Sequence, residues 1–129
     1  MRLPKFEYLS PDTLEQALEL LHSQSGNASI LAGGTDLLVR MKLGIAAPKC
    51  LISLKGLNEL SYIKKDDKLI KMGSKTSLKD IINSDLIREQ ALALRTACEK
   101  IGALTIQHHK GTIGGNILQE NRCHYYNQS

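Results

Sequence analysis

Short apolar runs alternate with helical patterns along the chain, and this alternation predicts a mixed fold of strands and helices. Apolar, strand-like runs are followed each time by glycine or polar residues that favour turns. Residues 28–31 and 50–53 are predicted strands, and residues 6–9 are predicted to be a short strand or an extended lead-in. Residues 61–64 and 69–72 are predicted to form a hairpin with a charged turn at 65–67. The sequence therefore predicts an α+β or α/β class.

Helices are predicted where apolar residues recur every three or four positions. The segment Ser10-Pro11-Asp12-Thr13 offers a capping hydroxyl, a proline for the first helical position and an acid in the first turn. The buried face of the helix that follows is predicted to consist of Leu14, Ala17, Leu18 and Leu21. A second helix is expected over 37–43, capped by Thr35 or Asp36, and Thr76-Ser77 is expected to cap a short third one.

The longest helix is predicted over 85–100. Its apolar stripe comprises Ile87, Ala91, Leu94, Cys98 and Ile101. Gly102 stands where a glycine commonly follows a helix end. A short apolar stretch at 104–106 then leads to His108 and His109, which would point to opposite faces on a strand and so would not bind one zinc ion.

Two glycine loops give the strongest chemical signal. They are Ala32-Gly33-Gly34-Thr35-Asp36 and Gly111-Thr112-Ile113-Gly114-Gly115-Asn116. Adjacent glycines let the backbone turn sharply and bring its N–H groups close to a ligand, and several N–H groups pointing one way form an anion site. Either loop alone is explained equally well as a tight turn. Two such loops could grip the two phosphates of one dinucleotide from opposite sides, so we expect them to face each other with their N–H groups directed at the ligand.

Composition narrows the function classes. The chain has 129 residues, a formal charge of +4 and three cysteines. The cysteines are irregularly spaced, which does not suggest a disulfide scaffold, and the lysines are scattered, which disfavours a nucleic-acid partner. We find no signal peptide and no apolar run of about 18 residues, so no membrane segment is expected and the cytoplasm is the expected location.

Other motifs are excluded or explained structurally. The chain has neither a Walker A sequence nor the spaced Gly-x-Gly-x-x-Gly of a Rossmann fold. Cys50 and Cys98 lie on apolar segments and are expected to be buried and inert. Cys123 stands between Arg122 and His124 in a polar tail, where it is a plausible metal ligand. No catalytic acid, base or nucleophile is predicted.

The two loops, in this order, resemble the flavin-pyrophosphate loops of the FAD-binding medium subunits of molybdenum hydroxylases. The spans that carry the resemblance are residues 30–38 and 111–117, supported by Phe6-x-Tyr8-x-x-Pro11 and by Gly73-x-x-Thr76. It implies an FAD-binding domain of the vanillyl-alcohol oxidase (PCMH) type, with two α+β lobes that hold FAD between them. We expect a first lobe at about 1–55 and the start of a second at about 56–129, incomplete at the C-terminus.

The resemblance also implies site residues. FAD contacts are expected from Ser29, Ile30, Leu31, Ala32, Gly33, Gly34, Thr35 and Asp36, and from Gly102, Gly111, Thr112, Ile113, Gly114, Gly115, Asn116 and His124. Asn116 is expected to hold the turn of the second loop. The family often has an Arg-Asn pair before this loop, and Gln107-His108 stands in its place here.

The tail, residues 122–129, resembles the β subunit of 4-hydroxybenzoyl-CoA reductase. In that subunit an inserted loop carries four cysteines for a [4Fe–4S] cluster. Cys123 matches the first of them, and the other ligands would lie beyond Ser129. The chain is therefore expected to be an N-terminal fragment.

The implied function is that of a flavin electron-transfer subunit in an oxidoreductase complex. The implied partners are a molybdopterin-binding large subunit, a [2Fe–2S] small subunit and a ferredoxin-type electron donor. The fragment alone is expected to be inactive. A second hypothesis is a truncated, non-catalytic assembly module that no longer holds FAD.

Overall fold

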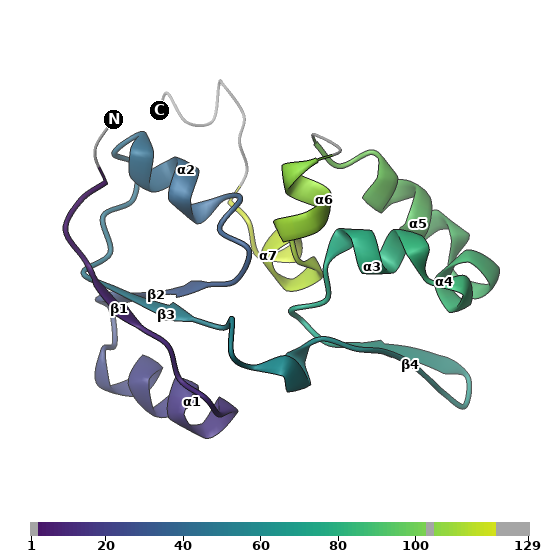
Figure 1. Cartoon of the computed structure of the whole chain (residues 1–129), viewed down its shortest axis with the longest axis horizontal. Helices are drawn as coiled ribbons and strands as arrows, with labels where there is room; N and C mark the ends of the chain where they lie inside the picture. Colours follow the sequence, from purple (N-terminus) through teal and green to yellow (C-terminus); the bar gives the residue numbers. More distant parts are fainter. Residues whose placement is uncertain (1–2, 103–104, 121–129) are drawn as a thin grey trace.

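The structure is a computed structural model that describes residues 3–102 and 105–120. Its N-terminal part contains a three-stranded parallel sheet of β1 (Glu7–Leu9), β2 (Ala28–Leu31) and β3 (Cys50–Ser53), in the order β1-β3-β2. The two crossover helices, α1 (Leu14–Ser23) and α2 (Leu37–Lys42), lie on opposite sides of this sheet (Figure 1). All three strands lie where the sequence predicts them.

The central strand and α1 form the first core. Every residue of β3 is buried, as expected of a strand with neighbours on both edges and a helix on each face. Ala17 of α1 packs with Cys50, Ile52 and Leu57. The predicted helical face is wrong at Leu18, which is 57% exposed. The helix also starts later than predicted, because the hydroxyl of Thr13 caps it by accepting from the amide of Gln16.

The C-terminal part combines, among the described residues, a hairpin with one short 3-10 helix and five short α-helices. The elements are η1 (Asn58–Leu60), β4 (Ile63–Asp66), β5 (Leu69–Met72), α3 (Leu78–Asn83), α4 (Asp85–Gln90), α5 (Leu92–Glu99), α6 (Ile106–Lys110) and α7 (Ile113–Ile117). A second core packs α3, α4 and α5 around Leu78, Ile81, Ile87 and Cys98. Each part of the described chain therefore has its own apolar centre.

Three further elements differ from the prediction. The first hairpin strand, expected at 61–64, is β4 at Ile63–Asp66. The helix expected over 85–100 is broken at Ala91, whose backbone leaves the helical region (φ −144°, ψ 49°), so that α4 and α5 are separate helices that both pack on α3. The segment expected to be strand-like before the second loop is instead α6. His108 and His109 are therefore neighbours on a helix, and only His108 is buried.

In the described part of the chain, no helix has the length and apolar character needed to cross a bilayer. Figure 1 shows α6 and α7 beside the end of β2 and the start of α2, which places the two glycine loops between the N-terminal and the C-terminal parts.

Candidate functional site

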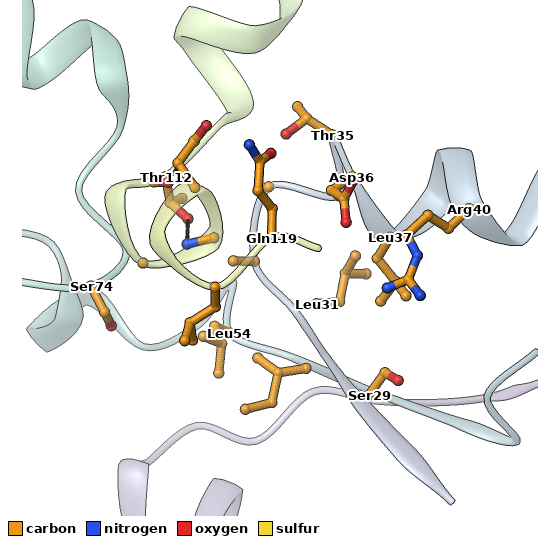
Figure 2. A pocket seen from close by; sticks show the side chains of 18 of the residues that line it. Ser29, Leu31, Thr35, Asp36, Leu37, Arg40, Leu54, Ser74, Thr112 and Gln119 are labelled. Carbon is orange, nitrogen blue, oxygen red and sulfur yellow. Dashed lines mark hydrogen bonds between the residues drawn. The ribbon is translucent and has the colours of Figure 1, made fainter. Parts of the chain in front are cut away.

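The two glycine loops line one cavity of about 510 Å³. All eight predicted residues of 29–36 line it, together with Thr112, Gly114, Gly115 and Asn116 of the second loop. Figure 2 shows Thr35 and Asp36 on one side of this space and Thr112 on the other. Residues about eighty positions apart in the sequence are thus brought together as expected.

The loops touch through backbone atoms at Gly33. A Cβ at this position would lie 1.5 Å from the carbonyl oxygen of Lys110 and 3.2 Å from the amide nitrogen of Gly111. No side chain fits there, so glycine is required for this close approach. At the next residue, Gly34 has a φ of +74°, a conformation that disfavours other residues.

The first loop has N–H groups available for a ligand. Within the described residues, we find no hydrogen bond donated by the amides of Gly33 or Gly34. Both glycines line the cavity. Both glycines are half-buried, and amides that line a cavity without a donated bond among the described residues can donate to a ligand acceptor such as a phosphate oxygen.

The second loop differs from the expectation. Its amides are used inside the protein: Ile113 donates to the carbonyl of Thr76 (2.9 Å), Gly114 to the carbonyl of Ser74 (2.9 Å) and Gly115 to the hydroxyl of Thr112 (3.1 Å). The expectation that this loop directs its N–H groups at an anion is therefore wrong for these three amides. The loop instead forms a fixed wall, to which Thr112 and Asn116 contribute side chains.

Asn116 holds the turn, as expected. Its side-chain nitrogen donates to the carbonyl of Thr112 at 2.9 Å. Thr112 is buried and caps α7, so hydrogen bonds within the loop hold both Thr112 and Asn116 in place. Gly114 approaches Ser74 so closely that a Cβ would lie 2.8 Å from its carbonyl oxygen.

Arg40 is a cavity residue that the sequence analysis missed. It lies on α2 and forms an ion pair with Glu120, with Nη2 2.6 Å from Oε2. Its position one helical turn after Asp36 was the available signal, because a helix that starts at a ligand-binding loop carries its next turn past the same ligand. The other missed lining residues are Leu21, Ala28, Leu37, Leu54, Ser74, Leu118 and Gln119.

A second cavity of about 300 Å³ adjoins the first. Thr35, Asn116 and Gln119 line both, so the two spaces are neighbours. The remaining lining residues are Ile101, Gly102 and Gln107. An elongated ligand could therefore extend from the glycine loops into a region whose described lining residues include no ionisable side chain.

Gly102, predicted as a contact, lies in this second cavity. Its φ is +55°, and a Cβ would lie 1.1 Å from the side-chain oxygen of Gln107. The Nε2 of buried His108 contacts the carbonyl oxygen of Ile101 at 2.9 Å. His108 thus contacts the backbone of the 101–102 turn, and the side chain of Gln107 lies against Gly102.

Four predicted residues remain. Two of them line neither cavity, and the other two lie outside the described residues. Gly111 and Ile113 belong to the second loop but line neither cavity, and the amide of Gly111 donates to the carbonyl of Gln107 (2.7 Å). Cys123 and His124 lie outside the described residues. Across 3–102 and 105–120, no group of three His, Cys, Asp or Glu residues could hold a metal ion.

Cys50 and Cys98 are buried, as predicted. Burial raises the pKa of both thiols, and for Cys50 the negative charge of Glu7 adds to the effect. His109 is engaged by protein groups, since its Nδ1 is 2.7 Å from the carbonyl oxygen of Thr105 and its Nε2 is 2.9 Å from Nζ of Lys79. Burial accounts for the two cysteines, and contacts with protein groups account for His109.

Comparison with known proteins agrees with this geometry. Residues 4–126 match the family described as "FAD binding domain in molybdopterin dehydrogenase". The FAD-subunit of nicotinate dehydrogenase from Eubacterium barkeri is 37% identical over 87% of this chain, which spans 38% of that protein. The medium chain of carbon monoxide dehydrogenase from Hydrogenophaga pseudoflava is 34% identical over 88% of this chain and 39% of its own length.

Solved structures show the same fold. Carbon monoxide dehydrogenase from Hydrogenophaga pseudoflava superposes with a TM-score of 0.87 at 34% identity, over 91% of this chain and 40% of that one. Reconstituted CO dehydrogenase from Oligotropha carboxidovorans gives 0.87 at 30% identity, over 90% and 40%. The chain thus spans about two fifths of the length of these relatives. This chain therefore belongs to the family of FAD-binding domains found in molybdopterin dehydrogenases.

Proposed function

We propose that this chain is the FAD-binding part of an electron-transfer subunit in a molybdenum-containing oxidoreductase, and that it holds the diphosphate of FAD between its two glycine loops. The observation that carries the proposal is the shared cavity. Two Gly-Gly segments distant in the sequence line one space, and the amides of the first are unpaired within the described residues. Family membership supports FAD as the dinucleotide.

The residues present fit a dinucleotide diphosphate. The amides of Gly33 and Gly34 supply donors, and the side chains of Thr112 and Asn116 form the opposite wall. The adjoining cavity, whose described lining residues are uncharged, has space for a neutral part of the ligand. When bound, FAD supplies the redox chemistry, while the protein binds and orients it. No side chain of this chain has to act as an acid or a base.

The partners are proposed by analogy with the relatives. Those relatives are named as an FAD-subunit and as medium chains of dehydrogenases. We accordingly propose a molybdopterin-binding large subunit and a [2Fe–2S] small subunit as partners, with the substrate bound outside this chain. A ferredoxin-type donor belongs to the narrower proposal that follows.

The narrower proposal is a 4-hydroxybenzoyl-CoA reductase-like complex. It rests on the resemblance of residues 122–129 and on Cys123 as the first ligand of a [4Fe–4S] cluster. Reading the gene beyond the codon for Ser129 tests it. Further cysteines in a short downstream segment support the cluster, and their absence refutes it.

A ligand series tests the main proposal. The purified chain is titrated with FAD, FMN and riboflavin, with flavin fluorescence as the readout. If the loops hold the diphosphate, FAD binds most tightly, and ADP, which carries the same diphosphate, displaces it. Equal affinity for riboflavin and FAD would refute a diphosphate site. A chain that folds but binds none of them supports the alternative, a non-catalytic assembly module.

A further inference from the structure

The charges around the first cavity are arranged unexpectedly for an anion site. Among its described lining residues, Arg40 is the cation and Asp36 is the carboxylate. Arg40 is already paired, because its Nη2 lies 2.6 Å from Oε2 of Glu120. With this pair formed, the net formal charge of the three groups is −1.

A dinucleotide diphosphate carries two negative charges. It would enter a space whose described cation, Arg40, is already paired with Glu120, so Arg40 attracts the ligand less while Glu120 stays in place. Carboxylate and phosphate oxygens bind a guanidinium through the same planar, bidentate geometry. Glu120 therefore occupies Nη2 of Arg40, one of the donors through which a phosphate could bind.

The position of Arg40 brings it close to the ligand loop. Its amide donates to the carbonyl of Asp36 at 3.0 Å, so it lies one turn of α2 after the first glycine loop. In Figure 2 its side chain bends back past Leu37 toward the side of the cavity where Ser29 lies. The Arg40 side chain is 21% exposed, whereas that of Glu120 is 66% exposed.

We propose that Glu120 is an internal competitor for the ligand: a phosphate of the bound dinucleotide takes over the guanidinium of Arg40, and Glu120 moves into solvent. This exchange rests on the proposed function in taking the diphosphate of FAD as the anion. It requires little of the protein, because Glu120 is largely exposed and exposed ion pairs contribute little to stability. It makes Arg40 a binding residue and Glu120 a regulator of affinity.

The test is a double-mutant cycle on the whole chain, read as dissociation constants for FAD and for ADP. E120Q frees Arg40 and is expected to tighten binding about twofold to fivefold, the range of an exposed ion pair. R40Q is expected to weaken binding at least about tenfold, as for a lost hydrogen bond to a charged group. R40K keeps the charge and should lie between R40Q and the unmodified chain.

The decisive variant is R40Q/E120Q. With no guanidinium to compete for, removing the carboxylate should give no gain over R40Q. D85N is the matched control, because Asp85 forms an exposed pair with Arg88 (2.7 Å) and does not line either cavity. It removes the same charge and should leave affinity unchanged. Thermal unfolding of each variant verifies that it is folded.

The outcomes separate the two proposals. If FAD binds and E120Q changes nothing, or gains equally in the R40Q background, the exchange is overturned and the proposed function stands. If ADP follows the expected pattern but FAD does not bind, the exchange stands with another nucleoside diphosphate and the proposed function fails. If neither the unmodified chain nor E120Q binds FAD or ADP, both are overturned.

Discussion

Replacing Gly33 by alanine tests the contact on which the cavity depends. The new Cβ would lie 1.5 Å from the carbonyl oxygen of Lys110. Ordinary contacts between such atoms are about 3.5 Å, so the two loops would have to separate by roughly 2 Å. Gly33 has no positive φ, so the effect of G33A comes from this collision alone.

Overpacking of this kind costs about 1–3 kcal/mol, and for a chain of this size that lowers the unfolding midpoint by about 3–10 °C. A 2 Å separation also exceeds the tolerance of hydrogen bonds to a bound diphosphate. We therefore expect G33A to weaken FAD binding at least about tenfold. Fluorescence titration with FAD measures the affinity, and thermal unfolding measures the stability.

G44A is the control for stability. Gly44 has a φ of +74° and no atom within 4 Å of its Cβ position, so alanine strains the backbone there by about 1 kcal/mol without touching the loops. It should lower the unfolding midpoint while FAD affinity stays unchanged. Wild-type affinity in G33A, or an equal loss of affinity in G44A, would refute the reasoning.

Three further predictions concern the wall, a helix cap and the thiols. T112V removes the hydroxyl that accepts from Gly115 and should lower the free energy of unfolding by about 1–3 kcal/mol in urea titrations, whereas T112S should restore it. S77A removes the acceptor for the amide of Asp80 and should cost about 1 kcal/mol in the same assay, with α3 otherwise intact. In a C123S background, the buried thiols of Cys50 and Cys98 should react with a disulfide reagent only on unfolding. Because burial raises their pKa, the unfolded state loses these protons first, so the free energy of unfolding should fall as pH rises past the ordinary thiol pKa; a rise would contradict this.

The sequence predicted those parts of the fold whose signals are local. Strand β2 runs directly into a glycine pair, and β3 is a short apolar run, so both were found at their observed positions. Helix caps are less certain when two candidates stand close together. Ser77 caps α3 as predicted, whereas Ser10 and Thr13 both precede α1 and the later of the two, Thr13, is the cap.

The errors occurred where packing overrides local preference. Nothing in residues 85–100 marks a break, because the segment has neither glycine nor proline, yet the chain bends at Ala91 so that two helices cover α3. The expectation that the amides of the second loop face a ligand is wrong for Ile113 and Gly114 because carbonyls elsewhere in the chain accept from them. Ser74 and Thr76, whose carbonyls accept from that loop, lie far away in the sequence.

The close approach of the backbones at Gly33 and Lys110 affects how cooperatively the chain unfolds. They join two parts that have separate apolar centres, and the ion pair between Arg40 and Glu120 also connects these parts. A dinucleotide bound between the two loops would contact both parts, so its binding free energy would stabilise the folded state of both parts at once. Cofactor loading then becomes part of what makes the chain a single cooperative unit.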